Sequence, residues 1–320
     1  MCGIVGYIGH RQAYPILIKG LRRLEYRGYD SSGVALVGDG GELKVYKSKG
    51  KIDNLEAYSA DKDVTGTIGI AHTRWATHGE PNDTNAHPHY SQTKNLALIH
   101  NGIIENYSTI KKNLINNGYT FRSETDTEVL VQFIEYIKKE NKVDLLTAVQ
   151  LALTQVVGAY AIGIVERNNP DQIIVARKSS PLVVGIGDDE YFIGSDASPI
   201  VEFTDKVVYL EDDEIAVLDR HKGVRFCTIS NVVKTHEIKK LETTLDELEK
   251  NGYPHFMLKE IYEQPSKLID SMKGRISIDN HTVSLSGVID NKDKFLNANR
   301  IIIVACGTSW HAGLVGEFLF

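Results

Sequence analysis

The sequence predicts an α+β protein in which β-sheets are packed between helices. Short apolar runs, rich in β-branched residues and separated by turn residues, recur up to residue 193 and are typical of strands. Segments with an apolar residue every three or four positions are typical of helices. Together they fit a layered α+β domain. At 320 residues the chain is also long enough for two domains.

The first predicted elements are a buried strand, a helix and a hairpin. The strand is the glycine-flanked apolar run after Cys2, and the helix is a stripe at residues 12–26. Strands are expected at 34–37 and 43–46, joined by a glycine-rich turn, and at 67–72. Residues 73–95 then form an irregular segment long enough to indicate a functional or mobile loop.

Further strands and helices follow this loop. A strand at 96–100 is expected to stop at Asn101-Gly102, and a helical stripe begins at Ile103. Residues 123–128 look like an N-cap and acidic first turn of the next helix. A helix at about 143–156 leads into short strands at 159–165, 173–176, 182–184 and 191–193.

A charged stretch at residues 234–251 indicates a connector helix and a domain boundary. We divide the chain into a first domain at 1–240, a linker at 241–252 and a second domain at 253–320. In the second domain an apolar strand at 300–306 enters a small-residue turn at Gly307-Thr308-Ser309 and then the start of a helix, a pattern with which α/β domains bind anions. One strand and a helix fragment cannot bury their own faces, so we expect this domain to be incomplete as given.

Composition argues against several functional classes. Apolar residues make up 42% and charged residues 24%, and a net charge of −6 argues against a nucleic-acid surface. Three widely separated cysteines argue against a disulfide framework, so we expect a reducing, cytoplasmic compartment. No signal-like leader or apolar run of spanning length is present, and we expect no membrane role.

Cys2 is the first candidate for chemistry. If Met1 is removed, the Cys2 thiol, of pKa ~8.5, shares its residue with an α-amine of pKa ~7.7–8.0 that can accept its proton. If Met1 is retained, the amine belongs to the wrong residue and we expect no activity. The alternative is that Cys2 is a small buried hydrophobe, as most cysteines near a terminus are.

The long loop offers a candidate site for a carboxylate. Arg74 lies at a strand end beside Trp75, and a bidentate pair with a carboxylate contributes about 1.5–3 kcal/mol. The alternative is a structural arginine that bridges loops. Four nearby histidines fit none of the usual zinc spacings, so we expect neither a metal nor another cofactor: His72, His78, His87 and His89.

Three more residues complete the inventory. Asn101 and Gly102 offer donors to a developing oxyanion, although Asn-Gly is also the commonest turn dipeptide. Asp126 lies in a first helical turn, where it complements the helix dipole or can hold a substrate ammonium. With Cys2 and Arg74, these groups fit attack on the side-chain amide of an amino acid, and glutamine is the obvious candidate.

The motifs that contain these residues resemble the class II, N-terminal-nucleophile glutamine amidotransferases. The matching segments are CGIVG at 2–6, RLEYRGYDS at 23–31, HTRWATHG at 72–79, HNG at 100–102 and SETDTE at 123–128. KEIYEQP at 259–265 and ACGTS at 305–309 resemble the members in which a sugar-isomerase domain follows. The resemblance covers essentially the whole chain.

The resemblance implies a role for each matching residue. Cys2 would be the nucleophile, with its α-amine as general base, and Asn101 and Gly102 would form the oxyanion hole. The substrate-binding residues would be Arg74 for the α-carboxylate, Asp126 for the ammonium and Trp75 as the gate for ammonia, together with Thr77 and His78. Cys306, Thr308 and Ser309 would begin a sugar-phosphate site.

The implied fold is a four-layer αββα sandwich, followed by the start of an α/β sugar-isomerase domain. The implied reaction of the full-length enzyme, a homodimer, transfers ammonia from L-glutamine to fructose 6-phosphate. This chain alone is expected to hydrolyse glutamine without making glucosamine 6-phosphate. Two alternatives are another class II amidotransferase, such as the phosphoribosyl one, and a catalytically silent regulatory or metal-binding module. The segment around Cys306 favours the sugar-isomerase partner over the phosphoribosyl one.

Overall fold

The chain divides into two compact units, Met1–Glu249 and Lys250–Phe320. A computed structural model describes residues 2–38, 40–76, 79–241, 252–272, 276–277, 281–283, 288 and 291–319. The division between the units falls inside the segment proposed above as a linker. Within the described ranges, no helix is both long enough and apolar enough to cross a membrane.

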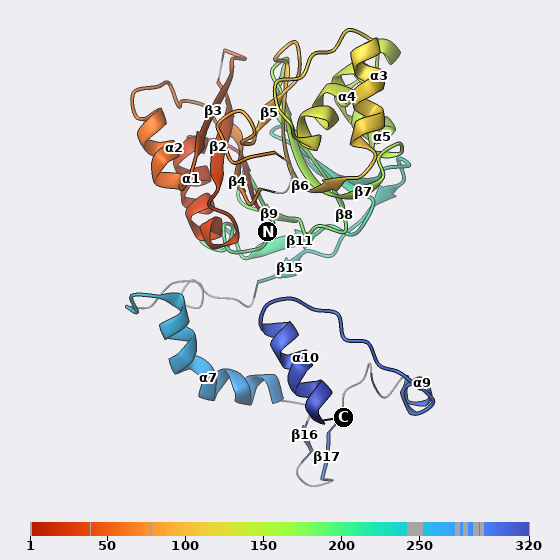
Figure 1. Cartoon of the computed structure of the whole chain (residues 1–320). Coiled ribbons are helices and arrows are strands. Elements are labelled where there is room, and N and C mark those ends of the chain that lie inside the picture. Colours follow the sequence, from red (N-terminus) through yellow and green to blue (C-terminus); the bar gives the residue numbers. More distant parts are fainter. Residues whose placement is uncertain are drawn as a thin grey trace. The chain divides into compact units, whose positions relative to one another are not determined.

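Two antiparallel sheets form the centre of the first unit (Figure 1). Sheet A joins its strands in the order β15-β11-β9-β10-β1-β4-β2-β3, and sheet B in the order β14-β13-β12-β8-β7-β6-β5. The strands of sheet A are β1 Gly3–Ile8, β2 Ser31–Val37, β3 Leu43–Lys49, β4 Ile68–Arg74, β9 Val183–Ile186, β10 Tyr191–Gly194, β11 Lys206–Tyr209 and β15 Lys239–Lys240. Those of sheet B are β5 His89–Tyr90, β6 Leu96–Ile104, β7 Gly158–Glu166, β8 Asn169–Lys178, β12 Glu214–Asp219, β13 Gly223–Thr228 and β14 Val233–Lys234.

Helices cover the outer face of each sheet (Figure 1). On sheet A these are α1 Ala13–Leu24, which ends in the 3-10 turn η1 Glu25–Arg27, and α2 Ile52–Ser59. On sheet B these are α3 Tyr107–Asn116, α4 Asp126–Asn141 and α5 Leu145–Leu153. The order helices, sheet, sheet, helices confirms the predicted αββα sandwich.

Strand alternation separates the core into three apolar layers. Along β4, Ile68 and Ile70 face sheet B, whereas Ala71 faces the α1 side. Along β6, Ile99 faces sheet A and Leu98 faces the α4 side. Burial of each isoleucine or leucine stabilises the fold by about 1.5–3 kcal/mol. A slip of a strand by one residue would move these side chains into the wrong layer. The register of the strands is therefore fixed, and with it the direction of the side chains at the strand ends.

The predicted end of the strand at Asn101-Gly102 is wrong, because β6 continues to Ile104. Both residues pair with β7, Asn101 opposite Ala161 and Gly102 opposite Tyr160. The ladder to β7 overrides the turn tendency of the dipeptide. Gly102 keeps an unusual backbone within the strand, with φ at +133°.

The predicted connector helix at 234–251 is also wrong in its first part. Val233–Lys234 forms β14 and Lys239–Lys240 forms β15, at the edges of the two sheets. Exposed edge strands commonly carry lysine, which discourages pairing with other chains, and this accounts for the charge of the stretch. Residues 242–251 lie outside the described residues.

The second unit, taken by itself, is built mainly of helices. It contains α7 Phe256–Met272, β16 Ile276–Ser277, β17 Thr282–Val283, α9 Lys292–Leu296 and α10 Thr308–Leu319. Residues 300–306, predicted as a strand, form no strand, because the described part of this unit holds no neighbouring strand with which they pair. The helix predicted to start after Gly307 is confirmed as α10.

Candidate active site

A cavity of about 340 Å³ lies where β1, β4, β6 and the start of α4 meet. Its volume falls within the range of small-molecule sites. It is lined by the predicted glutaminase residues Cys2, Arg74, Trp75, Asn101, Gly102 and Asp126. Thr77 and His78 lie outside the described residues. Cys306, Thr308 and Ser309 belong to the second unit, where all three are exposed.

Cys2 is held at the cavity by the strands around it. The next residues are fixed because Ile4 N–H donates to Ser195 Oγ at 3.2 Å and Ser195 N–H donates to Ile4 O at 3.0 Å. The Trp75 N–H donates to Cys2 Sγ at 3.2 Å. Burial raises the pKa of the Cys2 thiol, opposed by the Trp75 N–H and by the charge of Arg74. A thiol with a raised pKa needs a base to become a nucleophile near neutral pH.

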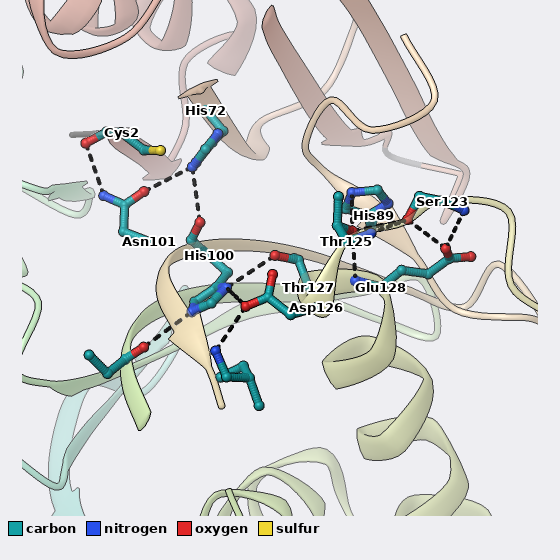
Figure 2. A network of polar contacts seen from close by, with 12 residues as sticks. Cys2, His72, His89, His100, Asn101, Ser123, Thr125, Asp126, Thr127 and Glu128 are labelled. Carbon is teal, nitrogen blue, oxygen red and sulfur yellow. Dashed lines mark hydrogen bonds and ion pairs between the residues drawn. The ribbon is translucent and has the colours of Figure 1, made fainter. Parts of the chain in front are cut away.

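Asn101 and Gly102, which are part of β6, lie beside Cys2. Asn101 Nδ2 donates to the Cys2 carbonyl at 3.1 Å, and Asn101 Oδ1 lies 2.8 Å from His72 Nε2 (Figure 2). At Gly102 a Cβ atom would lie 2.0 Å from the Ala159 carbonyl oxygen, so the position has room only for glycine. The strand therefore presents an amide donor next to the thiol-bearing residue.

The cavity contains one buried cation and one buried anion from the predicted set. Arg74 and Asp126 are only 3% and 4% exposed. Burial lowers the pKa of Arg74, against the influence of Cys2 and Asp126, and an arginine stays charged in proteins. Asp126 Oδ2 accepts the Ile104 N–H at 2.8 Å, and the N-terminus of α4 favours its negative charge.

A polar network fixes the start of α4, and with it Asp126 (Figure 2). Thr125 Oγ1 accepts the Glu128 N–H at 3.2 Å and lies 3.0 Å from His89 Nε2. Glu128 Oε2 in turn accepts the Ser123 N–H and the Ser123 hydroxyl, both at 2.6 Å. The predicted N-cap is confirmed at Thr125.

Trp75 differs from these buried residues because its side chain is 46% exposed. Its ring packs edge-on against Tyr29, with ring centroids 5.7 Å apart. Trp75 therefore lines the cavity while also facing solvent.

Several lining residues were not predicted as site residues. Arg27 and His100 occur inside motifs that carry the family resemblance, and this could have identified them as site residues. Ser180 and Pro181 reach the cavity from a later part of the chain, and nothing local marks them. The full set of residues missed is Arg27, His87, His100, Ile103, Thr125, Thr127, Ser180 and Pro181.

His72, His87 and His89 form a buried, neutral cluster. The His72 and His87 ring centroids are 4.3 Å apart, and those of His87 and His89 are 5.0 Å apart. Burial lowers the pKa of His72 to about 3 and holds those of His87 and His89 well below the ordinary value. Among the residues described, no group of three or more histidine, cysteine or acidic side chains is arranged to hold a metal ion.

Comparison with known proteins gives the family. A family model described as the glutamine amidotransferase domain matches residues 52–245. This chain belongs to the glutamine amidotransferases. It is 66% identical over 319 residues to glutamine–fructose-6-phosphate aminotransferase (isomerizing) of Bacteroides thetaiotaomicron. This match covers 100% of this chain and 52% of that protein. The chain is 53% identical over 323 residues to the protein of the same name from Chlorobaculum tepidum, again covering 100% and 52%. It thus spans about half the length of these relatives.

Two solved structures have the same fold. Glutamine phosphoribosylpyrophosphate amidotransferase from B. subtilis superposes with a TM-score of 0.61 at 30% identity, over 72% of this chain and 50% of that one. A structure described as the allosteric regulatory enzyme of purine biosynthesis gives 0.62 at 30% identity, with the same coverage. These likenesses confirm the predicted N-terminal-nucleophile sandwich.

The neutral histidine cluster predicts acid-sensitive folding. His72, His87 and His89 stay unprotonated when folded but bind protons below pH ~6.5 when unfolded, so the unfolded chain binds more protons and stability falls as pH falls. Well below pH ~6.5, each histidine makes the free energy of unfolding fall by up to about 1.4 kcal/mol per pH unit. Urea unfolding measured from pH ~7 to pH ~5 checks this.

The matched variants are His89→Gln, which should remove one histidine's share of the change of unfolding free energy with pH, and His10→Gln, which should not. His10 is the control because it is exposed. An unfolding free energy that stays constant between pH ~7 and pH ~5 would contradict the buried neutral cluster.

Proposed function

We propose that Cys2 is the nucleophile of a glutaminase and that removal of Met1 frees its α-amine to act as general base. The observation that carries the proposal is the common lining of one cavity by Cys2, Asn101, Arg74 and Asp126. These side chains supply a thiol, an amide donor, a cation and an anion. Glutamine presents a matching amide, α-carboxylate and ammonium.

In the proposed reaction, the α-amine takes the thiol proton and Cys2 Sγ attacks the side-chain amide carbon. The carbonyl electron pair moves to oxygen, where Asn101 Nδ2 and the Gly102 N–H stabilise it. The carbon–nitrogen bond then breaks, the protonated amine returns its proton to the leaving nitrogen, and ammonia departs. A glutamyl thioester remains on Cys2, and water hydrolyses it to glutamate.

The substrate would be oriented by its two charged ends. The Arg74 guanidinium would pair with the α-carboxylate, and the second oxygen of Asp126, besides the one bound to Ile104, would accept from the ammonium. The half-exposed Trp75 would gate the passage of ammonia. Thr77 and His78 are proposed as further substrate-binding residues from the family resemblance.

We further propose that the longer protein transfers this ammonia to fructose 6-phosphate, the substrate after which both relatives described above are named. Residues 1–240 would be the glutaminase domain, 241–252 a linker and 253–320 the start of a sugar-isomerase domain. Within it, Cys306, Thr308 and Ser309 would begin a sugar-phosphate site, at the N-terminus of α10. A homodimer follows from the same resemblance. A cytoplasmic location is supported by three cysteines that form no disulfide.

The competing functions have less support. The matched phosphoribosylpyrophosphate amidotransferase is 30% identical, against 66% for the Bacteroides relative. A silent regulatory or metal-binding module would not need a thiol, an amide donor and two opposite charges around one cavity.

Replacing the nucleophile tests the glutaminase. Cys2→Ala should lower glutamine hydrolysis at least ~10³-fold, because none of the other residues described around the cavity carries a thiol. Ammonia and glutamate release by the folded chain measure it. Cys227→Ser is the control, since Cys227 is buried in the core between sheet B and its helices. A Cys2→Ala chain that releases ammonia at the parent rate would overturn the proposal.

The acceptor is tested in the complete polypeptide. Fructose 6-phosphate should raise glutamate release several-fold and yield glucosamine 6-phosphate, whereas phosphoribosyl pyrophosphate should have no effect. If phosphoribosyl pyrophosphate alone stimulates glutamate release, the acceptor is a phosphoribosyl compound and the proposed acceptor is wrong. The glutaminase proposal would not be affected.

A further inference from the structure

His72 contacts the oxygen of the Asn101 amide, and the nitrogen of the same amide contacts Cys2 (Figure 2). It is on β4, two residues after Ile70, and strand alternation directs its side chain toward sheet B. Asn101 is on β6, two residues after Ile99, and is directed toward sheet A. His72 is fully buried and does not line the cavity, so it can act on a substrate only through a neighbour.

His72 is the donor in both of its hydrogen bonds. Its Nε2 lies 2.8 Å from Asn101 Oδ1 and 3.1 Å from the His100 carbonyl oxygen. Both partners are acceptors, so Nε2 must carry the hydrogen. Asn101 Nδ2 then donates to the Cys2 carbonyl at 3.1 Å. His72 therefore donates to Asn101, and Asn101 in turn donates to Cys2.

The reversed orientation of the Asn101 amide is disfavoured at both ends. A turned amide would place its NH₂ group against the His72 N–H, and its oxygen against the Cys2 carbonyl oxygen. Two attractive contacts would become two repulsive ones in a buried environment, where unpaired polar groups are costly.

His72 is suited to this role at every working pH. Its surroundings are apolar strands, the rings of His87 and His100, and the cation Arg74, and burial lowers its pKa to about 3. Its Nδ1 has no hydrogen-bond partner within the described residues, as expected for a ring nitrogen without a proton. The ring therefore stays a neutral Nε2–H donor.

We propose that His72 is a positioning residue that holds the Asn101 amide with its NH₂ group toward Cys2, where it donates to the Cys2 carbonyl. The inference rests on the proposed function, in which this NH₂ group stabilises the oxyanion. Donors that are already oriented need no rearrangement when charge develops, and this is the source of their effect on rate. Without His72, the amide would also sample the orientation that presents oxygen to the oxyanion.

Three variants test the position of the donor in the full chain. In His72→Gln the side-chain nitrogen can reach the Nε2 position, in His72→Asn it reaches only the Nδ1 position, and His72→Leu has no donor. We expect kcat for glutamine hydrolysis to fall ~10- to 100-fold in the Asn and Leu variants, below the ~10²–10³-fold cost of losing a donor outright. The Gln variant should stay within about fivefold of the parent, and KM should change less than about threefold in all three.

Two further readouts separate positioning from a structural role. Alkylation of Cys2 by iodoacetamide forms no oxyanion, so its rate should match the parent in every folded variant. The pH profile of kcat between pH ~6 and pH ~9 should keep its shape, because His72 does not titrate there.

A parent-like kcat in His72→Asn would overturn the inference, and so would a loss in His72→Gln equal to that in His72→Asn. If the Asn and Leu variants do not fold, a loss above ~10-fold in a folded Gln variant would overturn it. Failure of the proposed function is distinguishable, because it would show as hydrolysis that survives Cys2→Ala, whatever the His72 series gives.

Discussion

The packing of sheet A against sheet B is the constraint on which the site depends. Ile68 and Ile70 on β4 face Ala97 and Ile99 on β6 across this layer. Each apolar pair fixes the register of its strand, and the alternation then directs the next residues into the same layer. Those residues are His72 and Arg74 on β4 and Asn101 on β6. The site is thus the polar end of an apolar stripe, and a one-residue slip would turn its side chains toward the outer helices.

A buried polar site also has to satisfy its own hydrogen bonds. Polar groups moved away from water are costly unless they are paired, and the network at the start of α4 pairs Ser123, Thr125 and Glu128. The loop that carries His87 is attached in the same way, since Lys47 Nζ donates to the Thr84 carbonyl at 3.0 Å and the Ala86 carbonyl at 2.8 Å. The loop is therefore held against sheet A by bonds that its own sequence does not reveal.

The sequence was informative where chemistry requires a particular residue type. A thiol next to the initiator methionine, an arginine at a strand end and an acid in a first helical turn each have few explanations, and their combination suggested glutamine. The cavity brings together Cys2, Arg74 and Asp126, which are far apart in the chain. Thr77 and His78 remain predictions.

Long-range pairing explains what the sequence did not predict. Asn101-Gly102 is a turn signal, but the ladder to β7 keeps both residues in the strand. The strands β11 to β13 were not predicted, and Lys234 of β14 and both residues of β15 fell inside the predicted connector helix. The strands β14 and β15 are edge strands of two residues each, too short to show an apolar alternation. Residues 301–306 have the composition of a buried strand, but composition does not supply the neighbours that a strand needs.

The central claim is that one residue supplies both the attacking sulfur and the nitrogen that accepts its proton. The most direct measurement is the mass of the amino-terminal peptide from a chain quenched with acid during glutamine turnover. The account predicts a peptide that begins at Cys2, without Met1, and carries one γ-glutamyl group on sulfur. A fully active chain whose peptide still begins with Met1, or that never carries the glutamyl group, would contradict it.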